Sequence, residues 1–136
     1  LYRNYNEKIN WNSLTGYLDE LSKRQPAINI FTLCGHNTLR AAVNGYERKE
    51  LDSNQLNEMR KLLRKSLSEG ACGLSTGLLY SPGKFSDSGE LQTLLSETAS
   101  SGKLYATHLR SEGKMLIEAI SEAARSAAGP AQESST

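Results

Sequence analysis

Hydrophobic residues along this chain follow two spacings that alternate from one segment to the next. Helical spacing of apolar side chains predicts four helices, over residues 12–25, 52–69, 87–101 and 113–128. Short apolar runs predict three strands, over residues 27–34, 71–75 and 103–107. Residues 36–51 hold Gly45 and many charges, so we expect a loop there. The predicted order is a leading helix, followed by three strands that alternate with three helices.

Several helix ends and faces carry specific signals. Asn12 or Ser13 is expected to cap the first helix, with Trp11 packing at that end, and Asp52 or Ser53 the second. The segment Asp87-x-x-Glu90 resembles a capping box at the start of the third helix. The inner side of the last helix is expected to consist of Met115, Leu116, Ala119, Ile120 and Ala123.

The alternation of strands and helices predicts an α/β fold with a parallel sheet and right-handed crossovers. Three such strands neither close a barrel nor make a comfortable open sheet, because both outer strands would expose an apolar edge. We therefore expect residues 1–136 to be one piece of a larger barrel, or to associate so that the edges are covered. Residues 1–10 and 130–136 are polar and are expected to be loose.

Composition narrows the classes of function. Sixteen basic and fifteen acidic residues leave a net charge of +1, which gives no electrostatic reason to expect a nucleic acid or an acidic membrane as partner. No apolar run is long enough to span a bilayer. Cys34 and Cys72 are interpreted as buried thiols in a reducing compartment, so a cytoplasmic location is the expectation.

Two polar side chains follow predicted strands. His108 comes at the carboxyl end of the strand over 103–107, and Tyr80 lies in the Gly-rich loop after the strand over 71–75. In strand–loop–helix units this end of the sheet collects ligands and metals. A phenol there could donate to the oxyanion of a tetrahedral intermediate, although a tyrosine can equally be a lid over apolar side chains. His108 can likewise be a histidine that is simply hydrogen-bonded at a strand end.

Three blocks of sequence carry a resemblance to a known family. They are Gly35-His36-x-x-Leu39-Arg40, then Glu69-Gly70-Ala71-x-Gly73-Leu74-Ser75-Thr76-Gly77-Leu78-x-Tyr80-x-Pro82-Gly83, and Tyr105-Ala106-Thr107-His108-Leu109-Arg110-x-Glu112-Gly113. In order and spacing over nearly residues 11–125, the chain resembles the D-aminoacylase branch of the amidohydrolases, the zinc-dependent N-acyl-D-amino-acid deacylases.

The resemblance implies the middle portion of a (β/α)₈ TIM barrel that hydrolyses N-acyl-D-amino acids at a zinc site. His108 matches a zinc ligand of the family, and Tyr80 falls in a block that implies substrate contact and a catalytic role. The family's metal-binding cysteine, its second histidine and its catalytic aspartate have no match in this sequence. Cys34 is not expected to be a ligand, and His36 is a candidate only for shaping the rim of the site.

Two hypotheses follow. The first is that the chain is part of a zinc hydrolase that deacylates N-acyl-D-amino acids with a metal-activated water, inactive as an isolated piece. The second is a non-catalytic α/β module that binds a partner through exposed strand edges. Self-association of the isolated chain is expected in either case. Arg110 and Glu112 are expected to form an ion pair that fixes their loop.

Overall fold

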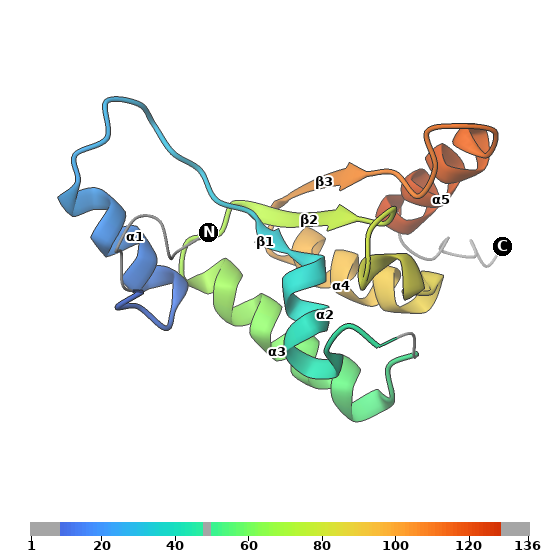
Figure 1. Ribbon diagram of the computed structural model, residues 1–136, viewed down its shortest axis with the longest axis horizontal. Coiled ribbons are helices and arrows are strands. Elements are labelled where there is room, and N and C mark those ends of the chain that lie inside the picture. Colours follow the sequence, from blue (N-terminus) through green and yellow to red (C-terminus); the bar gives the residue numbers. More distant parts are fainter. Residues whose placement is uncertain (1–8, 48–49, 129–136) are drawn as a thin grey trace, which may run out of the picture. The chain divides into compact units, whose positions relative to one another are not determined.

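The computed structural model describes residues 9–47 and 50–128 (Figure 1). The chain divides into two compact units, residues 1–30 and residues 31–136. The first unit contains helix α1, Leu14–Lys23. Its cap is Ser13, whose side chain accepts a hydrogen bond from the backbone N–H of Gly16 at 3.0 Å, and the Trp11 and Tyr17 rings lie 5.6 Å apart. The expected cap and the packing of Trp11 are confirmed, although the helix is shorter than predicted.

The second unit is built on a parallel sheet of three strands in the order β1 (Cys34–Gly35), β2 (Gly73–Gly77) and β3 (Leu104–His108). Strand β2 lies in the middle, with Gly77 opposite His108 at the carboxyl end. The parallel α/β fold is therefore confirmed. The two longer strands begin and end one or two residues later than predicted.

A helix follows each strand. The helices are α2 (His36–Asn44), α3 (Ser53–Ser68), α4 (Ser88–Ser100) and α5 (Leu116–Ala128), with a 3₁₀ turn η2 at Gly83–Phe85. Helices α2, α3 and α4 lie on one side of the sheet (Figure 1). The buried apolar side chains between these helices and the sheet are Leu39, Met59, Leu63, Leu67, Leu74, Leu78, Leu91, Leu94 and Leu95.

The two faces of the sheet differ in character. Leu74 and Thr76 are buried on the face that the helices cover. Alternate residues of a strand point to opposite faces, so Ser75, Ala106 and His108 share the other face, where none of them is fully buried. In a closed barrel such a face, small side chains with one polar group at the end, lines the interior.

The strand predicted over 27–34 is wrong for most of its length. Only Cys34 is in a strand, and Ile28 and Phe31 are 73% and 78% exposed. The physical reason is the lack of a partner, because β2 begins at Gly73 and the chain before it is the end of α3. Upstream of β1, the Thr32 carbonyl still accepts a hydrogen bond from the Cys72 N–H at 2.8 Å.

The loop predicted over 36–51 is also wrong, because its first nine residues form α2. The N-cap is Gly35, which offers no side-chain hydrogen bond, so the usual start signal is missing from the sequence. Gly45 ends the helix with a φ of 65°, a conformation that favours glycine. The glycine read as a loop residue is therefore a helix terminator.

Helix α5 starts later than predicted, and its apolar side is less buried. Ala119 is buried and Ala123 is half-buried, whereas Met115, Leu116 and Ile120 are exposed. Within the described residues, α5 packs mainly on α4, and no further strand or helix covers these side chains. None of the helices in residues 9–47 and 50–128 is long and apolar enough to cross a membrane.

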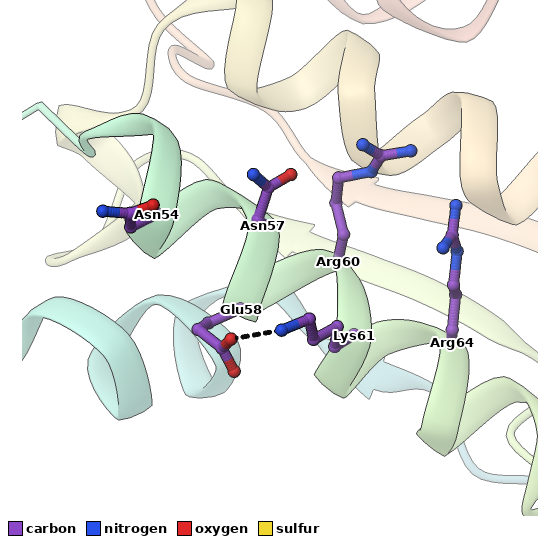
Figure 2. Close-up of a pocket in the computed structure, with 6 residues that line it drawn as sticks. All are labelled: Asn54, Asn57, Glu58, Arg60, Lys61 and Arg64. Atoms are coloured by element: carbon purple, nitrogen blue, oxygen red, sulfur yellow. Dashed lines mark hydrogen bonds and ion pairs between the residues drawn. The ribbon is translucent and has the colours of Figure 1, made fainter.

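The outer side of α3 carries three neighbouring basic residues, Arg60, Lys61 and Arg64. Figure 2 shows a pocket lined only by α3 residues: Asn54, Asn57, Glu58, Arg60, Lys61 and Arg64. Lys61 pairs with Glu58 at 2.6 Å, and Arg60 and Arg64 both pair with Glu97 of α4. Carboxylates of the same two helices thus neutralise much of this basic face.

Glu97→Gln is expected to lower the free energy of unfolding by about 0.5–1 kcal/mol at neutral pH. The Arg64 and Arg60 guanidinium groups lower the pKa of Glu97 in the folded state. The stabilisation is therefore present above the unfolded-state pKa of about 4.3 and is lost as the pH falls through the lower folded-state pKa. Urea unfolding of the wild type and of the variant measures the difference in the free energy of unfolding at neutral pH and again at acid pH. Glu58→Gln, at an exposed pair within α3, is the matched control and should change stability less. A loss for Glu97→Gln that persists in strong acid would contradict this account.

Candidate functional site

Three candidate residues lie at or after the carboxyl ends of the three parallel strands, at the same end of the sheet. His36 follows β1 as the first residue of α2, Tyr80 lies in the loop after β2, and His108 is the last residue of β3. The strand register sets this arrangement, because Gly77 pairs with His108 and the N–H of Leu78 donates to the His108 carbonyl at 3.1 Å. The loop after β2 therefore starts directly beside the histidine.

Tyr80 and His108 contact each other. The N–H of Tyr80 donates to the Gly77 carbonyl at 3.2 Å, and this turn folds the tyrosine back toward the sheet. Its ring centroid lies 5.1 Å from that of His108, with 51° between the ring planes. A β-carbon at Gly77 would lie 3.4 Å from the tyrosine ring, which is an ordinary van der Waals distance, so the ring packs closely over this turn. Tyr80 is 53% exposed, so about half of its surface faces solvent.

The imidazole of His108 has a buried nitrogen, Nε2, for which the described residues provide no hydrogen-bond partner. Its Nε2 atom is buried, makes no hydrogen bond to any of the described residues, and lies 3.5 Å from Oε1 of Glu112. Buried polar atoms of this kind are uncommon, and a metal ion is one of the groups that satisfies them. Neutral imidazole nitrogen is also a good ligand for zinc. His108 therefore fits the role of one metal ligand.

A complete metal site is not formed by these residues. Within residues 9–47 and 50–128, no group of three or more His, Cys, Asp and Glu side chains is placed so that it could hold a metal ion. Cys34 is a free thiol in the first residue of β1, and burial raises its pKa, which disfavours the thiolate that binds metals. The remaining ligands would have to come from other chain segments.

His36 does not lie with Tyr80 and His108 in an open site. It is fully buried, and its Nε2 atom lies 2.8 Å from Oε1 of Glu90 on α4. The other oxygen of Glu90 accepts from Nη1 of Arg40 at 2.5 Å, and Arg40 is also fully buried. His36, Arg40 and Glu90 thus form a buried polar triad between α2 and α4. Both ring nitrogens of His36 have protein partners, since Nδ1 lies 3.3 Å from Oδ1 of Asn37.

Two sequence interpretations near the site are wrong in detail. Asp87 caps α4 by accepting from the N–H of Glu90 at 2.7 Å, but the Glu90 side chain is part of the triad and does not complete a capping box. Arg110 pairs with Glu122 of α5 at 2.8 Å, and Glu112 lies beside His108 instead. In both cases a distant partner provides a better-buried hydrogen bond than the neighbour in sequence.

Sequence reasoning missed the triad because it treated residues 36–51 as a loop. His36 and Arg40 are four residues apart, a spacing that places both on one face only if the segment is a helix. The sequence pattern Asp87-x-x-Glu90 favours a local capping role for Glu90 instead. The signal that could have revealed the triad was the pair of charged or polar residues at helical spacing beside Leu39 and Val43.

Curated proteins with similar sequences are enzymes of one kind. D-aminoacylase from Alcaligenes xylosoxydans xylosoxydans is 34% identical over 109 residues, which is 80% of this chain and 22% of the relative. N-acyl-D-glutamate deacylase from the same organism is 34% identical over 106 residues, 78% of this chain and 22% of that relative. The chain therefore spans about a fifth of the length of these relatives. No family model matches it.

Solved structures of enzymes of the same kind are also similar to this chain. A crystal structure of D-aminoacylase, described as defining a novel subset of amidohydrolases, superposes with a TM-score of 0.79 at 33% identity, covering 87% of this chain and 26% of that one. N-acyl-D-glutamate deacylase from Bordetella bronchiseptica superposes with a TM-score of 0.80 at 30% identity, covering 86% and 25%. That protein was solved with zinc and a phosphonate inhibitor that mimics the tetrahedral intermediate.

The parallel strand–helix units, with polar residues at the carboxyl ends, superpose on a part of D-aminoacylase, which is described as an amidohydrolase. The resemblance inferred from three blocks of sequence is confirmed: the chain is homologous to one portion of the D-aminoacylases and the related N-acyl-D-amino-acid deacylases.

Proposed function

We propose that this chain is the middle portion of a zinc-dependent hydrolase that deacylates N-acyl-D-amino acids. The observation that carries the proposal is the pair formed by His108 and Tyr80 at the carboxyl edge of the sheet. The histidine has a buried nitrogen without a hydrogen-bond partner among the described residues, and the exposed phenol lies beside it. The comparisons support the class of reaction, because the similar proteins are deacylases of N-acyl-D-amino acids.

In this proposal His108 is a metal ligand and Tyr80 is the residue that contacts the substrate. Zinc, when bound, supplies a Lewis acid and a water of lowered pKa. His108 offers Nε2 from a strand end, where the sheet fixes its position. Tyr80 offers a phenolic O–H, which stabilises developing negative charge on a carbonyl oxygen by donating a hydrogen bond. The proposal takes zinc as the metal because a deacylase 30% identical to this chain was solved with it.

Hydrolysis by the full-length protein tests this proposal. We expect release of free D-amino acids from a series of N-acyl-D-amino acids, little release from the L-enantiomers, and loss of turnover with a zinc chelator that added zinc reverses. The 136-residue chain alone should remain inactive with added zinc, because its described residues hold no three-ligand group. A full-length protein that folds and binds zinc but hydrolyses none of these amides would reject the proposal, as would zinc-dependent turnover by the chain alone that His108→Ala abolishes.

The rival function, partner binding through strand edges, keeps one supporting observation. The described residues place no further strand beside the edge strand β3, and Leu104 on the uncovered face of β3 is 68% exposed. We expect the isolated chain to self-associate at micromolar concentration for this reason. Analytical ultracentrifugation over a wide concentration range measures the effect, and a compact monomer throughout would argue against it.

A cytoplasmic location remains part of the proposal, in keeping with the free thiols of Cys34 and Cys72.

A further inference from the structure

The loop between β2 and α4, residues 78–87, is held by two arginines from different parts of the chain. Arg40 of α2 donates from Nε to the Pro82 carbonyl at 3.2 Å and from Nη2 to the Phe85 carbonyl at 3.4 Å. Arg110, just after β3, donates from Nη1 to the Lys84 carbonyl at 2.8 Å and from Nη2 to the Ser86 carbonyl at 3.1 Å. Four carbonyls within five residues thus receive guanidinium hydrogen bonds.

Each arginine also pairs with a carboxylate on a helix later in the chain: Arg40 with Glu90 of α4, and Arg110 with Glu122 of α5. Glu90 holds Arg40 within the buried triad, where His36 occupies the second carboxylate oxygen. Glu122 of α5 receives Nε of Arg110 at 2.9 Å and Nη2 at 2.8 Å. A guanidinium is planar and presents its donors in a rigid fork, so a carboxylate on one side orients the donors on the other. The two carboxylates therefore fix the orientation in which the guanidinium groups donate to the loop.

The hydrogen bonds of the loop lead back to Tyr80. The Tyr80 carbonyl accepts from the Lys84 N–H at 2.8 Å, and the Lys84 carbonyl is the acceptor of Arg110. Asn37 of α2 donates to the Gly77 carbonyl at 3.3 Å, and its side-chain oxygen would lie only 2.1 Å from a β-carbon at Gly83. The loop is consequently packed against α2 at a position where any side chain larger than that of glycine would displace Asn37.

We propose that Arg40 and Arg110 are positioning residues that hold Tyr80 against His108, one from each neighbouring strand–helix unit. Tyr80 is more than half exposed, so burial of its ring does not fix it, and the conformation of its loop must. A purely structural arginine needs only a carboxylate partner, as Arg64 has in Glu97. Arg40 and Arg110 instead direct their remaining donors to one loop. A catalytic role for this arrangement rests on the proposed function, but the hydrogen bonds from Arg40 and Arg110 to the loop do not.

The test follows the ring of His108 by nuclear magnetic resonance in the full-length protein labelled at histidine. The ring signals of His36 and His108 are assigned from the signals that disappear when each histidine is replaced with glutamine. A tyrosine ring at 5.1 Å shifts the His108 ring protons, and Tyr80→Leu gives their position without that ring. At a pH of about 8, where an ordinary imidazole is neutral, Arg110→Lys should remove most of the difference between wild type and Tyr80→Leu. Lysine keeps the charge but cannot reproduce the fork.

Arg60→Lys is the matched control, because Arg60 also pairs with a glutamate but donates to no loop carbonyl in the part of the chain that the structure describes. It should leave both histidines unchanged. Arg40→Lys should act as Arg110→Lys does, and Arg110 is the safer site because its side chain is 30% exposed. Unchanged His36 signals in Arg110→Lys would show that the fold is intact while the loop moves. The proposal is overturned if Arg110→Lys keeps the wild-type His108 shifts, or if wild type and Tyr80→Leu already coincide. Neither readout uses turnover, so a failure of the deacylase proposal remains distinguishable.

Discussion

Replacing His108 with alanine in the full-length protein is expected to remove bound zinc and nearly all deacylase activity while leaving the fold intact. His108 is the last residue of β3, and its side chain lies on the face of the sheet that the helices do not cover. Truncation there removes little packing, since large losses of stability come from cavities in the core. A missing ligand, in contrast, affects metal binding directly. Elemental analysis and circular dichroism on the same purified sample measure both quantities.

The matched comparison is His36→Ala, which should have the opposite effect. His36 is fully buried, and its loss leaves Glu90 with one partner fewer. We therefore expect a less stable protein that still binds zinc when folded. Full zinc occupancy in a folded His108→Ala protein would show that His108 is a structural histidine. Loss of zinc from folded His36→Ala would instead place His36 in the metal site.

The sequence predicted the parts of the fold that depend on regular apolar spacing. The stripe of Met59, Leu63 and Leu67 on α3 is buried as expected, with Asp52 as its cap and a left-handed Gly70 at its end. The parallel sheet also followed from the alternation of elements. These features arise from local patterns, and local patterns are present in the sequence itself.

The parts that failed depend on contacts between distant residues. Residues 27–33 have the composition of a strand, but a strand needs a partner, and the residues before β2 belong to the end of α3, so β2 pairs only with Cys34 and Gly35 of β1. Helix α2 begins at a glycine without a side-chain cap, so its start left no signal. The partners of Arg40 and Arg110 lie 50 and 12 residues away in sequence, beyond the reach of any local rule.

Arg40→Met is expected to have the largest effect on stability, lowering the free energy of unfolding by about 3–5 kcal/mol. The substitution keeps an apolar stem but leaves the buried carboxylate of Glu90 with only His36, and the carbonyls of Pro82 and Phe85 lose donors. A buried charge without its counter-charge is costly. Because small domains are stable by only about 5–15 kcal/mol, part of the variant should already be unfolded. Urea denaturation followed by circular dichroism measures the change.

A double-substitution cycle identifies the cause of this loss. If the unpaired carboxylate dominates, Glu90→Gln should restore stability to Arg40→Met, because the isosteric amide carries no charge and still reaches His36. If the lost carbonyl contacts dominate, the double variant should be no more stable than Arg40→Met. Arg60→Met on the outer face of α3 is the control, with an expected loss below about 1 kcal/mol, since its pair with Glu97 is partly exposed. An Arg40→Met protein within about 1 kcal/mol of wild type would mean that the triad contributes little to holding α2 against α4.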